Sequence, residues 1–200
     1  MCVSAAVLLV LAPGCLMPQS VDPANTRPHT IPRVDLTKLP NYLLQPALTL
    51  DPQEKADVTS NPPCHCQLDV GISAIIADDP TVDVDVRVFV DYDVNVPRSQ
   101  PPVSTLRLPG SFTVSDTTRF LSAPIPFDSS RLGGPGLHVV ELVIGETGGF
   151  AADTVFPPHR AMLSTFESST FKFVVQVLQP NTKPGSCGDR QLPPQVKSCP

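Results

Sequence analysis

The chain of 200 residues contains no tryptophan and only two tyrosines, and 16% of its residues are charged. Its 14 lysines and arginines form no cluster, and the net charge is −5. A nucleic-acid partner needs grouped cations that neutralise its phosphates, so the sequence argues against one. No apolar run reaches the roughly 20 residues that a membrane-spanning helix requires.

Motifs of common enzyme classes are also missing. The chain has no G-x-S-x-G nucleophile elbow, no H-E-x-x-H metal motif and no G-x-x-x-x-G-K-[ST] phosphate loop. No patterned serine or cysteine accompanies any of the four histidines, which are His29, His65, His138 and His159. We therefore expect no catalysis and no cofactor, and we interpret each histidine as a surface or rim residue.

What the chain does have is an apolar leader. Residues 3–12 are apolar or small apart from Ser4, and Pro13-Gly14-Cys15 ends the run. About ten apolar residues are too few to cross a bilayer, but they suit the central region of a secretory signal peptide.

The stretch "LAPGC", residues 11–15, resembles the lipobox of bacterial lipoproteins. In that family a small residue precedes a cysteine that is acylated on sulfur before the peptide bond in front of it is cut. The resemblance implies a signal peptide over residues 1–14 and a lipid on Cys15. The alternatives are a plain signal peptide cut elsewhere and a buried N-terminal strand.

Residues 15–60 are predicted to form a Pro-rich extended tether. The part after Cys15 is polar, contains many prolines and has neither helical nor strand periodicity, so it favours an extended chain. One apolar patch interrupts it, "LPNYLLQPALTL" at residues 39–50. This patch is expected either to dock on another subunit of an envelope complex or to pack back on its own domain.

Residues 61–200 are predicted to form one β-domain. The even positions from 82 to 96 are valine except for Tyr92, whereas the odd positions are mostly Asp, Arg or Asn. This alternation predicts a strand with one face in a core and one face in water, and it predicts that Tyr92 points inward. The preceding strand alternates in the same way from Leu68 to Ile76, and "ADDPT" at residues 77–81 predicts the turn between them.

Later segments continue the β pattern. Residues 109–115 and 119–127 are predicted as Pro-bounded edge strands, residues 135–145 as a central strand, and residues 170–178 as the last strand. The sequence therefore predicts an all-β, antiparallel β-sandwich. The last two strands resemble those of bacterial immunoglobulin-like domains, and this resemblance implies an immunoglobulin-like fold without implying an activity.

Four cysteines lie outside the leader, and in an exported chain an even number indicates disulfides. A bond between Cys64 and Cys66 would be strained, because residues two apart on a strand are about 6.6 Å apart. We expect each of them to join one tail cysteine, Cys187 or Cys199. Zinc bound through "CHC" is disfavoured, because His65 would face away from both cysteines.

Six aspartates concentrate in sixteen residues, and such carboxylates can gather calcium. Most of them line one strand face, where the spacing holds them too far apart to share an ion. Only Asp78 and Asp79 in the turn could converge, so they are weak calcium candidates. The preferred interpretation is a solvated strand face without a metal.

These features predict a membrane-anchored lipoprotein of the bacterial cell envelope, exposed at the surface or in the periplasm and expected in the outer membrane. It would act as a structural or protein-interaction module with envelope proteins as partners. The alternatives are an accessory subunit of an envelope complex and a module that binds a glycan or small molecule. The shortage of Trp and Tyr argues against glycan binding, which uses aromatic stacking platforms.

Overall fold

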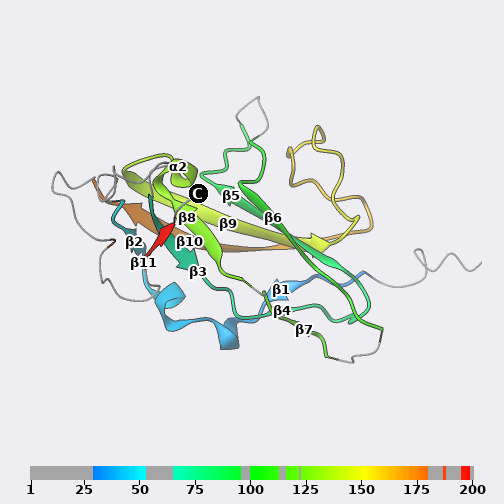
Figure 1. The fold of residues 1–200 in the computed structure, drawn as a ribbon. Helices are drawn as coiled ribbons and strands as arrows, with labels where there is room; N and C mark the ends of the chain where they lie inside the picture. Colours follow the sequence, from blue (N-terminus) through cyan, green and yellow to red (C-terminus); the bar gives the residue numbers. More distant parts are fainter. Residues whose placement is uncertain are drawn as a thin grey trace, which may run out of the picture.

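The computed structural model describes residues 29–52, 65–95, 100–112, 116–121, 123–179, 187 and 195–198. Within these residues the chain is almost all β, and its sheets pack against one another (Figure 1). The predicted all-β sandwich is confirmed. No helix among the described residues is long and apolar enough to span a membrane.

A five-stranded sheet forms one layer. Its strands in order are β2 (Leu48–Leu50), β10 (Ser168–Val177), β9 (Gly136–Glu146), β5 (Val84–Val90) and β6 (Ser104–Leu108). The predicted central strand is central, since β9 pairs antiparallel with β10 on one side and with β5 on the other. The sheet is mixed and not purely antiparallel, because β2 pairs in parallel with β10. A long stretch of chain separates these two strands, so no tight hairpin dictates an antiparallel pairing.

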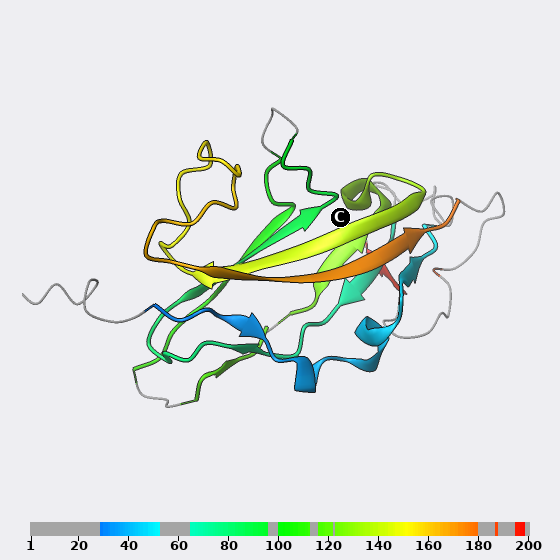
Figure 2. The same ribbon diagram turned by 180° about the vertical axis from the view of Figure 1, so that it is seen from behind.

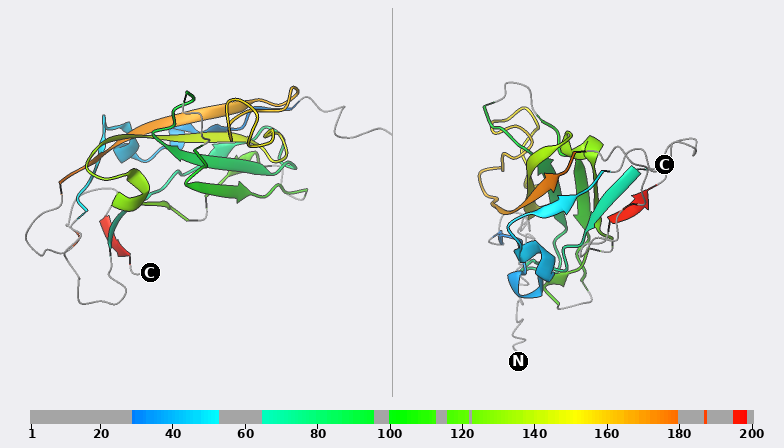
Figure 3. Two further views of the ribbon diagram at one scale, coloured as in Figure 1. Left: turned by 90° about the horizontal axis from the view of Figure 1, so that it is seen from above. Right: turned by 90° about the vertical axis from the view of Figure 1, so that its left-hand side faces the viewer.

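Two small sheets form the opposite layer (Figures 2 and 3). One contains β1 (Arg33–Val34), β4 (Ile75–Ile76) and β7 (Thr118–Arg119), and the other contains β11 (Gln195–Ser198), β3 (His65–Val70) and β8 (Ile125–Asp128). The 3-10 turns η1 (Leu36–Lys38) and η2 (Asn41–Leu44) connect β1 to β2. The one-turn helix α2 (Ser129–Leu132) follows β8.

The core lies between the layers, where the period-two patterns place it. The inward residues of β5, β9, β3 and β8 are all buried, and they include Val84, Val86, Val88, Val140, Leu142, Ile144, Leu68, Val70, Ile125 and Phe127. Alternation along each strand turns these side chains to one face of the sheet. The valine pattern therefore correctly predicted which face of β5 lies in the core.

The other face of β5 differs from the prediction, because it is not open to water. Phe89 is 1% exposed and Asp85 is 7% exposed. The loop of residues 147–167, at the top of Figure 1, supplies side chains that contact this face. Tyr92 was predicted to point inward, but it lies with Phe89 on the outer face. Asp91 has a φ of 48°, which ends the extended strand and reverses the alternation.

Residues 29–52 belong to the sandwich, although they were predicted as part of the tether over residues 15–60. Leu43, Leu48 and Leu50 are buried in the core, so the apolar patch at residues 39–50 packs on its own domain. The Tyr42 hydroxyl accepts a hydrogen bond from the Gly71 N–H, which fixes η2 against the second layer. The packed domain therefore begins before residue 61. Residues 15–28 and 53–60 lie outside the described residues.

Several elements were not predicted from the sequence, among them β1, β2, β6, α2 and β11. Residues 109–112 were expected to begin an edge strand but form none, and residues 113–115 lie outside the described part. Gly110 instead approaches the backbone of Thr81 so closely that a Cβ atom would collide with it. The Ser111 N–H donates to the Pro80 carbonyl beside this contact. The loop after β6 is thereby held against the turn at residues 77–81.

Candidate functional site

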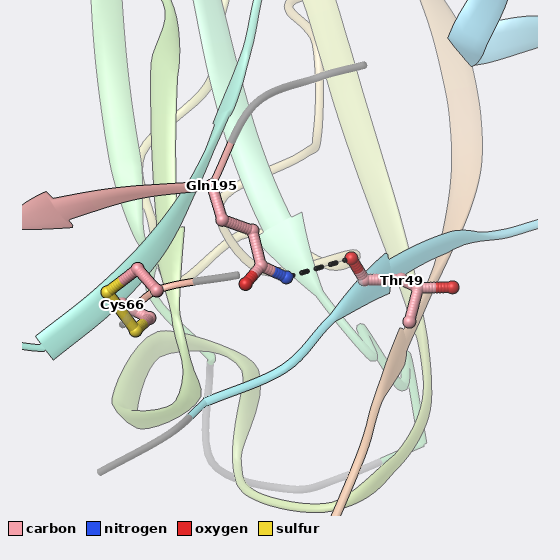
Figure 4. The surroundings of a disulfide bond; sticks show 4 residues. Thr49, Cys66 and Gln195 are labelled. Carbon is pink, nitrogen blue, oxygen red and sulfur yellow. Dashed lines mark hydrogen bonds between the residues drawn. A yellow bond between two sulfur atoms is a disulfide. The ribbon is translucent and has the colours of Figure 1, made fainter. Parts of the chain in front are cut away.

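A disulfide joins the first core strand to the C-terminal segment. Cys66 of β3 is bonded to Cys187, and their Cα atoms are 5.4 Å apart (Figure 4). This pair confirms the predicted link between the strand and the tail. Cys66 is therefore not free to ligate zinc, and it is buried whereas its neighbour His65 is exposed, as the alternation predicted. Cys64, Cys199 and the predicted lipidation site Cys15 lie outside the described residues.

The tail is also held by strand pairing. β11 pairs antiparallel with β3, from Gln195 opposite Leu68 to Ser198 opposite His65. The Gln195 side chain is buried, and its Nε2 donates to the Thr49 carbonyl of β2 over 3.2 Å (Figure 4). Covalent and hydrogen-bonded contacts thus attach the tail to both layers.

The two weak calcium candidates have different local roles. Asp78 forms an exposed ion pair with Arg33 over 3.2 Å. Asp79 accepts hydrogen bonds from the backbone N–H and the hydroxyl of Thr81, at 2.8 and 2.6 Å, and so closes the turn. In the part of the chain that the structure describes, no group of three His, Cys, Asp or Glu side chains could hold a metal ion.

The other aspartates of this region form hydrogen bonds and ion pairs at the two ends of β5. Asp83 accepts from the Gly110 N–H over 2.7 Å, and Asp85 pairs with Arg107 over 2.9 Å. At the far end, Asp91 accepts from the Val139 N–H over 2.7 Å. Of the carboxylates predicted to form a solvated face, Asp85 is buried in an ion pair, whereas Asp91 and Asp93 are exposed as predicted.

An ionic cluster around a buried carboxylate lies on the outer face of the five-stranded sheet. Its centre is Glu141 of β9, whose carboxylate side chain is 8% exposed. Arg160 from the loop of residues 147–167 contacts one carboxylate oxygen over 2.6 Å, and Lys172 of β10 contacts the other over 2.9 Å. The Arg160 guanidinium also lies over the ring of Tyr92 at 4.7 Å.

A second arginine, Arg87 of β5, contacts the loop of residues 147–167. The Arg87 guanidinium lies 4.0 Å above the ring of Phe150, and it donates to the His159 carbonyl over 2.6 Å. The Tyr92 hydroxyl donates to the Pro158 carbonyl over 2.7 Å, and burial raises the pKa of Tyr92. These contacts connect the loop of residues 147–167 to the end of β5.

The sequence carries one signal for this cluster. Glu141 lies in the middle of the apolar run of β9, between Val140 and Leu142, and a buried charge requires a partner. Arg160 and Lys172 are 19 and 31 residues away, so spacing along the sequence could not identify them.

Three of the histidines are paired with carboxylates. His29 Nδ1 lies 2.7 Å from Glu146 and its ring stacks on Phe166 at 3.7 Å. His138 lies between the carboxylate of Asp91 and the Gly134 carbonyl, at 2.7 and 2.8 Å. His159 Nδ1 lies 3.0 Å from Asp153. These pairings hold His29 at the end of β9, place Asp91 and Gly134 beside His138, and join two residues within the loop of residues 147–167.

Comparison with known proteins adds no relative. No protein family matches the chain, and no curated protein and no solved structure is significantly similar to it. The coordinates define the class as an all-β sandwich with a disulfide between its first core strand and its tail.

Proposed function

We propose that this chain is a lipid-anchored protein of the bacterial cell envelope that serves as a structural or protein-interaction module. The observation that carries the proposal is the apolar leader that ends in the lipobox-like "LAPGC" at residues 11–15. Acylation of Cys15 would fix the chain to a membrane, with the outer membrane as the expected site, and leave the sandwich in the aqueous phase.

The disulfide supports export. Bonds of this kind form and persist in oxidising compartments such as the bacterial periplasm and the cell surface. Cys66 is 2% exposed, so its bond to Cys187 belongs to the interior of the fold. A disulfide inside the fold and the predicted secretory leader point to the same side of the cytoplasmic membrane.

The surface supports interaction with other proteins more than binding of a glycan. Glycan sites use exposed Trp and Tyr rings, but the chain has no Trp, and both tyrosines make internal hydrogen bonds. Some large apolar side chains are exposed at the surface, for example Phe112 at 89% and Phe156 at 70%. Such side chains are suited to contacts with a protein surface.

The test is a single substitution in the leader. Cys15→Ser should remove the acyl label and move the protein from the membrane fraction to the soluble fraction. Cys2→Ser, which changes the other leader cysteine, is the matched control. It should leave the acyl label and the membrane association unchanged. Density separation of the membranes should place the wild-type protein with the outer membrane. Unchanged membrane association of Cys15→Ser with its acyl label intact would contradict the proposal.

A further inference from the structure

The ring of His138 lies between two hydrogen-bond acceptors at one end of β9. Its Nδ1 is 2.7 Å from the carboxylate of Asp91, directly after β5, and its Nε2 is 2.8 Å from the Gly134 carbonyl, in the turn that leads from α2 into β9. α2 and the end of β5 lie at the same end of the sandwich (Figure 1). An ionised carboxylate and a carbonyl can only accept, so both contacts are hydrogen bonds only when both ring nitrogens carry a proton. The arrangement therefore matches the doubly protonated imidazolium ion.

Asp91 is held in place from a second side. Its other carboxylate oxygen, Oδ1, accepts from the Val139 N–H over 2.7 Å, and this bond fixes the orientation of the carboxylate. The His138 side chain is 11% exposed, and the residue opposite it on β10 is Val175. The ring is thus largely removed from water, between an apolar neighbour and one carboxylate.

The other charged residues near this end form bonds of their own. Asp128 accepts from the backbone N–H of Arg131, and the Arg131 guanidinium donates to the Pro126 carbonyl. Asp93 is exposed and accepts from a backbone N–H two residues later. In the part of the chain that the structure describes, Asp91 is therefore the charged group that contacts the ring.

The turn of residues 133–136, which we call the glycine turn, has the backbone freedom to move. Gly133, Gly134 and Gly136 have φ angles of 91°, 102° and 148°, which glycine adopts without steric cost. The first two of these N–H groups donate to the Ser129 carbonyl, at 3.0 and 3.1 Å. A Cβ atom on Gly134 would meet no described atom within 4 Å, so the turn has open space beside it. The bond from the histidine ring to the Gly134 carbonyl holds it on the other side.

We propose that the glycine turn is a proton-dependent latch, which is closed while His138 carries two ring protons and opens when it loses one. The carboxylate holds the Nδ1 proton, so deprotonation releases the Nε2 proton to water and leaves a lone pair facing the Gly134 carbonyl oxygen. Two lone pairs at hydrogen-bond distance repel, and the turn moves outward. Histidine ordinarily titrates near pH 6.5, so the latch opens as the pH rises through that range. This inference does not depend on the proposed lipid anchor.

Hydrogen exchange of the full-length chain, followed by NMR, tests the latch. We expect the protection factor of the Gly134 amide to fall about tenfold from about pH 5.5 to about pH 8, as one charge-assisted hydrogen bond is lost. The amide of Val143, in the middle of β9, is the internal reference and should keep its protection factor. The spectrum of the ring nitrogens should show two protons on His138 at the lower pH and one, on Nδ1, at the higher pH.

Asp91→Asn should remove this pH dependence while it preserves the shape of the site. The amide Oδ1 still accepts from the Val139 N–H, so the NH₂ group faces Nδ1 of His138 and donates to it. A neutral ring then donates from Nε2 to the Gly134 carbonyl, and the turn stays closed at about pH 8. Asparagine also tolerates the φ of 48° at this position. The Gly134 protection factor of this variant should therefore be at least as high at pH 8 as at pH 5.5.

His29→Gln is the matched control, because His29 pairs with Glu146 at the opposite end of β9. This variant should show the wild-type fall in Gly134 protection, whereas His138→Gln should not. Circular dichroism checks that all variants are folded. Equal Gly134 protection in the wild type at both pH values would overturn the inference, and so would a wild-type fall in Asp91→Asn. Loss of the fall in His29→Gln would overturn it by assigning the pH dependence to the other pair.

Discussion

At the scale of single residues, the ion pairs of this protein differ mainly in how far they are removed from water. Glu141 and Arg160 are 8% and 18% exposed, whereas Asp78 and Arg33 are both 51% exposed. Removing one member of a buried pair leaves the other desolvated without compensation, whereas exposed ions are readily hydrated. The buried cluster should therefore dominate the electrostatic contribution to stability.

Glu141→Gln should lower the free energy of unfolding by about 3 kcal/mol, because Arg160 is left without its carboxylate. The matched change Asp78→Asn removes an exposed carboxylate in the same way and should cost about 0.5 kcal/mol or less. Chemical denaturation of both variants measures the two values. Equal losses would show that the cluster on the outer face is no more stabilising than a surface pair.

At the scale of elements, α2 is too short to be stable by itself and depends on its ends. Asp128 accepts from the Arg131 N–H over 2.9 Å and from the Ser130 hydroxyl over 2.6 Å, and Gly133 ends the helix with a φ of 91°. Burial raises the pKa of Asp128, but these hydrogen bonds outweigh it and leave the pKa below its ordinary 3.8. The ionised carboxylate is therefore the form that the folded state prefers.

Asp128→Ala should lower the free energy of unfolding by about 1 kcal/mol at neutral pH. The pKa is depressed in the folded state, so the stabilisation is present above the unfolded pKa and is lost as the pH falls through the folded pKa. The difference in the free energy of unfolding between the wild type and Asp128→Ala should therefore become smaller below about pH 4. Denaturation curves from pH 7 to pH 2 measure it. A difference that stays constant over this range would show that the carboxylate charge is not what caps α2.

At the scale of the whole molecule, the C-terminal tail is bonded to the strand that opens the core. Cys66 and Cys187 are 121 residues apart in the sequence. In chain-entropy terms, closing a loop of about 100 residues stabilises the folded state by up to about 4.7 kcal/mol. In the described part of the tail, this bond, the pairing of β11 with β3 and the hydrogen bond from Gln195 to Thr49 attach it to the sandwich.

Non-reducing peptide mapping should find the peptide of residues 64–66 joined to the tail until reductant is added. The Cys66–Cys187 bond leaves Cys64 and Cys199 as partners for a second disulfide. β11 pairs Ser198 with His65, and these residues are the sequence neighbours of Cys199 and Cys64. We therefore predict a Cys64–Cys199 bond. Cys187 bonded to Cys199 would contradict both assignments.

The sequence by itself determined the features that depend on neighbouring residues. Alternating valines place one side of β5 in the core because side chains on a strand point to opposite faces in turn. Apolar residues at both parities predicted that β9 is a central strand, and it pairs with β10 on one side and with β5 on the other. Its outer face is only partly covered, since Val143 is buried but Leu137 is 70% exposed. The Asp and Pro content of residues 77–81 predicted the turn there. The disulfide between the first core strand and the tail was predicted because the alternative, a bond between Cys64 and Cys66, would be strained.

Only the tertiary structure decided the features that depend on residues far apart in the sequence. Arg160 and Lys172 meet Glu141 because the loop of residues 147–167 folds back over the sheet. The short strands β2, β6 and β11 have too few residues for a clear pattern, and each forms only because a longer strand offers it hydrogen bonds. Leu43 is buried while its neighbour Leu44 is exposed because η2 turns one to the core and the other outward. Local composition is the same for both leucines, so their different environments are set by packing.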